Sequence, residues 1–117
     1  MSNIVIVIKE SKLEVAVLGK LRTLLSSPLT QIKSALVEGK PILEMELFDN
    51  KYDEKASLLR GLIDLVRKND LHAEVYELPS GQSFETSSVR KQSLIQLDVL
   101  ENILNSADDE AQRDGVD

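Results

Sequence analysis

The sequence contains no cysteine, no tryptophan and a single histidine, and aromatic residues make up only 3% of the chain. The absence of cysteine excludes a disulfide framework, a thiol nucleophile and a thiolate metal site. Because aromatic side chains are so few, the core has to be built from Leu, Ile and Val. No hydrophobic run approaches the length of a membrane span, so we expect no membrane partner.

The N-terminal region offers only a five-residue apolar run, "IVIVI" at 4–8, and no basic residue precedes it. A secretory signal peptide has a longer apolar segment behind a basic start. The run therefore predicts a β-strand, and we expect a cytoplasmic protein.

Basic charge is also scarce, since 14 basic residues face 20 acidic ones and give a net charge of −6. Nucleic-acid binding depends on a basic face that neutralises phosphates. No run of Lys and Arg is longer than two residues, so we expect no nucleic-acid partner. The acidity itself favours solubility and a basic protein partner.

Hydrophobic periodicity predicts the order of the elements. The β-branched run 4–8 is apolar on both faces, which is typical of a central strand. Leucines and valines, Val37 among them, then recur at helical spacing on stripes that we expect to face the sheet, and two further segments alternate between apolar and polar residues. The expected elements are a strand at 4–8, two helices within 14–38, a strand at 42–48, a helix at 53–68 and a strand at 72–78.

This order predicts an α/β fold of the type β-α-α-β-α-β, a three-stranded antiparallel sheet with helices on one face, plus a C-terminal helix. Within 14–38, Ser26-Ser27-Pro28 separates the two helices, with a serine as the expected cap of the second. Gly39 is expected to end that second helix in a left-handed conformation. Asn50 is the expected cap of the helix that follows.

We divide the chain into an α/β domain (1–79), a connector (80–88), a C-terminal helix (89–105) and an acidic, disordered tail (106–117). If the other helices cover one face of the sheet, the second face stays bare, with Phe48, Tyr76 and Leu78 on it. The C-terminal helix is expected to cover this face or to mediate a homodimer, and a second subunit on the open face is the alternative.

The segments "VAVLGKLR" (15–22), "LTQIKSALVE" (29–38) and "DEKASLLRGLIDLVRKNDLHAEVYEL" (53–78) resemble the C-terminal domain of the bacterial ribosomal stalk protein. The resemblance spans about residues 3–78 and implies the same element order. The adaptor that delivers N-degron substrates to the Clp protease shares this fold. Its acidic recognition loop and helix-terminal histidine have no counterpart in "KESK" (9–12) and "ALVEGK" (35–40).

In the stalk family, the first two helices recruit translation factors through apolar and basic residues. The resemblance places this surface on Val15, Leu18, Arg22 and Lys33, which we predict to be partner-binding residues. The chain departs from the family at Glu14 and Gly19, where the family has lysines, and at the "SSP" corner, where the family is rich in glycine. These departures reduce the positive charge of the surface.

Candidate catalytic or metal-binding chemistry is limited to a few residues. His72 begins a strand, where a histidine is usually solvated or locally bonded, and general-base catalysis requires a partner within reach. Glu44 and Glu46 share one strand face, and Glu74 lies on a neighbouring strand. These carboxylates could form a cation site or an acid–base pair, but an ordinary polar sheet face explains them better, because no ligand motif joins them.

We therefore predict a non-enzymatic protein–protein interaction module, an adaptor or inhibitor that uses the helix pair 14–38, without catalytic residues, metal or cofactor. One alternative is an immunity protein that neutralises a basic toxin. The other is a metal-binding protein or enzyme built on Glu44, Glu46, Glu74 and His72.

Overall fold

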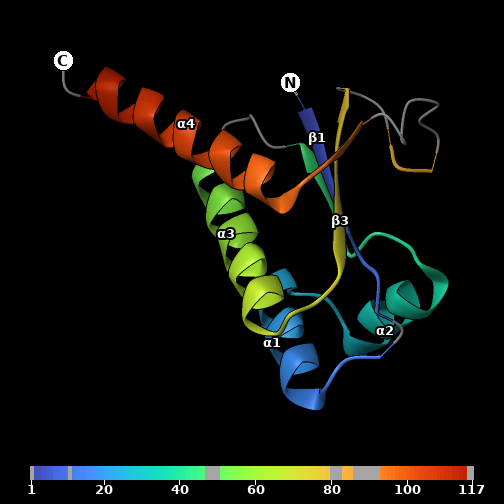
Figure 1. Cartoon of the computed structure of the whole chain (residues 1–117). Helices are drawn as coiled ribbons and strands as arrows, with labels where there is room; N and C mark the ends of the chain where they lie inside the picture. Colours follow the sequence, from blue (N-terminus) through green and yellow to red (C-terminus); the bar gives the residue numbers. More distant parts are fainter. Residues whose placement is uncertain (1, 11, 47–50, 80–82, 86–92, 116–117) are drawn as a thin grey trace.

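The computed structural model describes residues 2–10, 12–46, 51–79, 83–85 and 93–115. The elements are β1 (Ser2–Ile8), α1 (Val15–Leu25), α2 (Leu29–Glu38), β2 (Leu43–Glu46), α3 (Tyr52–Lys68), β3 (Ala73–Pro79), β4 (Leu94–Ile95) and α4 (Leu97–Gly115). The strands form one antiparallel sheet in the order β2-β1-β3-β4, which confirms the predicted α/β class. Figure 1 shows α1 and α2 at one end of the sheet and α4 near the other.

Strand β1 lies inside the sheet because its side chains are apolar on both faces of the pleat. It pairs with β2 from Asn3↔Glu46 to Ile6↔Leu43 and with β3 from Ser2↔Pro79 to Ile8↔Ala73. All five residues of the run 4–8 are buried. The segment that looked like a central strand in the sequence is therefore a central strand in the fold.

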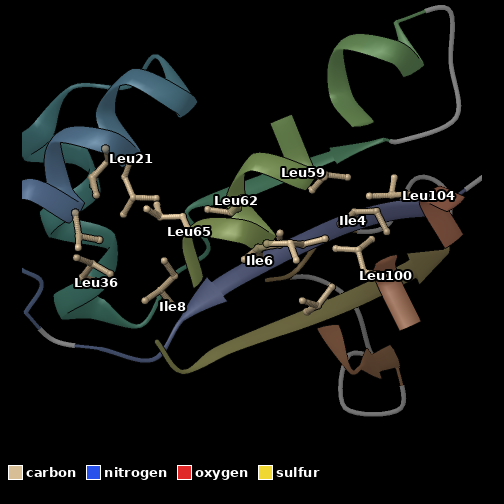
Figure 2. Close-up of a cluster of buried hydrophobic side chains, with 14 of the residues drawn as sticks. Ile4, Ile6, Ile8, Leu21, Leu36, Leu59, Leu62, Leu65, Leu100 and Leu104 are labelled. Atoms are coloured by element: carbon tan, nitrogen blue, oxygen red, sulfur yellow. The ribbon is translucent and has the colours of Figure 1, made fainter. Parts of the chain in front are cut away.

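The main core lies on one face of the sheet. Figure 2 shows Ile4, Ile6 and Ile8 of β1 directed toward leucines from all four helices. The buried members from the helices include Leu21 of α1, Leu36 of α2, Leu59, Leu62 and Leu65 of α3, and Leu100 and Leu104 of α4. Complete burial of one such side chain contributes about 1.5–3 kcal/mol, so this layer holds the helices on the sheet.

Helix α3 has the strongest helical signals in the chain. Its apolar stripe is buried, acids Asp53 and Glu54 lie in its first turn, and Arg67 and Lys68 lie in its last, where each sign complements the helix dipole. The expected cap Asn50 lies outside the described residues. Lys51 precedes the first turn and makes no side-chain cap hydrogen bond.

The prediction that the second face of the sheet is bare, or covered by the C-terminal helix, is wrong. Helix α4 packs on the same face as α3, because its buried leucines belong to the main core. On the second face, Val5, Val7, Tyr76 and Leu78 form a separate buried cluster against which Phe84 packs. The rings of Tyr76 and Phe84 meet edge to face, with centroids 5.1 Å apart. Phe48 lies outside the described residues.

The sheet also has a fourth strand where the sequence predicted three. Leu94 and Ile95 of β4 pair with Tyr76 and Val75 of β3, so the predicted helix 89–105 is wrong over 93–96. The helix was predicted because the apolar residues here continue the helical spacing. The segment pairs with β3 instead, because the backbone groups at the edge of that strand need hydrogen-bond partners. Residues 89–92 lie outside the described part. Helix α4 continues to Gly115, so the backbone is helical through most of the predicted disordered tail.

Candidate partner-binding groove between α1 and α2

A sharp corner joins α1 to α2. Ser26 ends α1 in the left-handed region, with φ 52° and ψ 38°, and Pro28 directly precedes α2. The expected serine cap is absent, because the Ser27 hydroxyl donates to the Leu25 carbonyl at 3.4 Å instead of accepting from α2. Gly39 ends α2 at φ 69°, as predicted, and its N–H donates to the Ala35 carbonyl.

Between the two helices lies a groove of about 400 Å³. Its floor and walls are aliphatic, and its rim carries two ammonium groups. The lining consists of Lys12 and Leu13 from the segment before α1, Val15 and Leu18 from α1, and Lys33, Leu36 and Val37 from α2. These described lining residues include no carboxylate, hydroxyl or imidazole, so the groove is suited to binding apolar groups.

Two of the lining residues are the most exposed large hydrophobic residues of the described chain. Val15 is 85% exposed and Val37 is 74% exposed. A single exposed aliphatic residue is ordinary on a protein surface, and two in one groove form a patch of the kind found at interfaces. The groove therefore combines a concave shape with accessible apolar surface.

The charge of this region is opposite to that of the chain as a whole. Residues 12–40 carry five basic and two acidic side chains, whereas all other residues carry nine basic and eighteen acidic ones. Within the described residues, Lys12 and Lys33 make no ion pair. Both ammonium groups are thus available to a carboxylate of a bound partner.

The structure brings together three of the four predicted partner-binding residues. Val15, Leu18 and Lys33 line the groove, although Leu18 is mostly buried and contributes only its outer edge. Arg22 is exposed on α1 but does not line the groove. Two accessible members of the lining, Lys12 and Val37, were not among the predicted residues.

Only one of the two missed residues, Val37, had a signal in the sequence. Val37 follows Lys33 by four residues, which places the two side chains on the same side of α2. Because Val37 is apolar, it was nevertheless predicted to belong to the stripe that faces the sheet. Lys12 precedes the first helical residue, so no helical periodicity included it.

The candidate metal-binding carboxylates lie on the second face of the sheet. The register places Glu44 opposite Val5 and Glu74 opposite Val7, so β1 separates these two glutamates. The Glu44 carboxylate accepts from the Phe84 N–H at 2.8 Å and ties the 83–85 segment to the sheet. A search of the described residues found no group of three or more potential metal ligands.

His72 contacts the carboxylate of Glu10 at the end of the β1–β3 pair where Ile8 lies opposite Ala73. Its Nδ1 lies 2.8 Å from Glu10 Oε1, and its backbone N–H donates to the same oxygen at 3.4 Å. The side-chain hydrogen bond to Glu10, reinforced by the negative charge of Glu10, raises the pKa of His72. The same contacts hold the pKa of Glu10 below its ordinary value. His72 is therefore locally bonded, as the sequence suggested.

A larger hollow of about 570 Å³ lies beside His72, and its lining includes Lys9, Leu71 and Leu97. Its lysine already has a partner, since Lys9 Nζ lies 3.5 Å from Glu74 Oε1. This hollow thus lacks the combination of exposed apolar surface and unpaired cations that distinguishes the groove between α1 and α2.

Comparison of the chain with protein-family models, with curated proteins and with solved structures found no match. Among the described residues, no helix is both long enough and apolar enough to cross a membrane.

Proposed function

We propose that this chain is a non-enzymatic protein-binding module, an adaptor or inhibitor, whose partner binds in the groove between α1 and α2. One observation carries the proposal. The two most exposed large hydrophobic side chains of the described chain, Val15 and Val37, lie in one groove beside two lysines without ion pairs. Binding would remove this apolar surface from water, which contributes about 25 cal/mol per Å².

The chemistry of the groove defines the partner segment that fits it. An aliphatic or aromatic side chain would fill the space between Val15 and Val37, and neighbouring carboxylates would meet Lys12 and Lys33. A second copy of this chain fits less well, because an isologous contact would place lysines of one groove against those of the other. The sequence resemblance to the stalk-protein domain supports the same pair of helices as the contact surface.

A capture experiment with matched charge reversals tests this proposal. The tagged chain is incubated at low salt with lysate of its native host, and bound proteins are identified by mass spectrometry. Lys33→Glu reverses a charge in the groove, whereas Lys20→Glu reverses an exposed lysine of α1 that does not line it. We expect Lys33→Glu to lose the partner and Lys20→Glu to retain it.

A third variant tests the apolar half of the groove. Val37→Glu should weaken binding of the captured partner by about tenfold or more, because hot-spot contacts at interface centres exceed about 1 kcal/mol. The thermal unfolding midpoint should stay unchanged, since Val37 is exposed. Equal capture by all four proteins would exclude the groove as the binding site, and empty captures would count against a binding module.

A further inference from the structure

One wall of the groove is formed by Lys12 and Leu13, which belong to the short segment between β1 and α1. Backbone hydrogen bonds hold the described ends of this segment. At its far end, the Glu14 carbonyl accepts from the Leu18 N–H and begins α1. At its near end, the Lys9 N–H donates to the His72 carbonyl at 2.7 Å, which extends the β1–β3 pairing by one residue.

Side chains add a second attachment at the near end. Glu10 Oε1 receives both the backbone N–H and the ring Nδ1 of His72, at 3.4 and 2.8 Å. Glu10 precedes Lys12 by two residues and Leu13 by three, so this contact restrains the chain close to the wall of the groove. Leu13 is also partly buried against the main core, whereas Lys12 is exposed and has no such support.

We infer that Glu10 and His72 are positioning residues, which hold the Lys12–Leu13 wall of the groove in its binding geometry. This inference rests on the proposed function of the groove. Neither residue lines the groove. Their role is to restrict the motion of Lys12, whose ammonium group is one of the two rim cations.

The contact depends on pH in a defined direction. His72 has a raised pKa and Glu10 a lowered one, so the charged pair forms between these two values. It is lost as the pH rises through the pKa of His72, and again as the pH falls through that of Glu10. The nearby charges belong to Asp70, which also raises the pKa of His72, and to the Lys9–Glu74 pair. The Lys12–Leu13 wall should therefore be least mobile in mildly acidic solution.

Nuclear magnetic resonance on the isotope-labelled full chain tests the inference without a partner. Backbone order parameters of Lys12 and Leu13, and the ring resonances of His72, are recorded from about pH 5 to about pH 8. We expect the order parameter of Lys12 to fall from about 0.85 toward about 0.6 as His72 loses its proton, with a matching midpoint. A field effect of the charge alone would shift resonances without changing order parameters.

Three variants complete the test. Glu10→Gln and His72→Gln should both give a low order parameter at Lys12 over the whole pH range, and Glu10→Gln should lower the midpoint of His72. The matched control Glu74→Gln removes the neighbouring ion pair and should leave the wild-type profile unchanged. A flat order-parameter profile in the wild type, or an unchanged one in Glu10→Gln, overturns the inference.

This readout is separate from the test of the proposed function. Val37→Glu should weaken capture of the partner and leave the pH profile of Lys12 intact. Failure of the capture experiment would therefore contradict the proposed function of the groove. It would not change the result for Glu10 and His72.

Discussion

Two pairs of helices pack on the same face of the sheet, and they differ in whether their outward cations form ion pairs. In the α3–α4 pair, Arg67 binds Asp98 at 2.6 Å and also binds Glu101, while Arg60 donates to Asn105 at 3.2 Å. These contacts join one helix to the other. In the α1–α2 pair, neither Lys12 nor Lys33 forms an ion pair with a described residue.

The apolar residues follow the same contrast. The deepest residues of α4, Leu100 and Leu104, are fully buried against α3 and β1. Val15 and Val37 of the α1–α2 pair lie mostly in solvent. Both pairs use leucines to attach to the sheet, but the two most exposed large hydrophobic side chains of the described residues lie in α1–α2. The contrast supports our proposal that α3–α4 serves mainly stability and α1–α2 serves recognition.

The largest effect should come from truncating a buried leucine of α4. Leu104→Ala removes a fully buried side chain and should lower the free energy of unfolding by about 2–5 kcal/mol, because it creates a cavity. The matched variant Val37→Ala should change it by less than about 0.5 kcal/mol. Chemical denaturation measures both values. Similar losses for the two variants would contradict the division between a structural and a recognition pair.

An intermediate effect should distinguish the glycines of the two pairs. A Cβ on Gly19 of α1 would meet no atom within 4 Å, so Gly19→Ala should raise the free energy of unfolding by up to about 1 kcal/mol. A Cβ on Gly61 of α3 would lie 3.0 Å from Leu24 Cδ1, so Gly61→Ala should gain less. Thermal and chemical unfolding of both variants measure the difference. An equal gain at both sites would show that the α1–α3 contact yields easily.

The smallest effect should come from the ion pairs of α4. Arg67→Ala removes a half-exposed guanidinium that pairs with two carboxylates. It should lower the free energy of unfolding by about 0.5–1 kcal/mol. Arg22→Ala should change it by less than about 0.3 kcal/mol, because an exposed side chain that has no ion pair with a described residue contributes little. The loss in Arg67→Ala should shrink at high salt. A loss that ignores salt would point to packing of the arginine stem instead.

Local sequence patterns predicted those elements that depend on local physics. The run 4–8 is apolar on both pleat faces and forms the inner strand β1. The stripe and terminal charges of α3 predicted its helix, and Gly39 adopts the expected left-handed conformation. The prediction that the second face of the sheet is bare was wrong, because no local pattern in the sequence shows that Phe84 packs against Val5 and Val7.

The candidate groove was predictable only in part. Val15 and Lys33 stood out as outward residues of two adjacent helices, in line with the family resemblance. Val37 was assigned to the core because helical spacing cannot distinguish a residue at the edge of the apolar stripe from one at its centre. The exposure of Val37 depends on how α2 is oriented against the sheet. The corner at Ser26 and Pro28 sets this orientation.

The sequence by itself determined the α/β class, the inner strand, three of the four helices in outline and the corner between α1 and α2. These features follow from side-chain periodicity and backbone preferences over a few residues. The tertiary structure decided the position of α4 on the α3 face, the pairing of β4 with β3, and the meeting of Lys12, Val15 and Val37 in one groove. Such contacts join residues far apart in the chain, so they depend on how whole elements pack and not on the local pattern of any one of them.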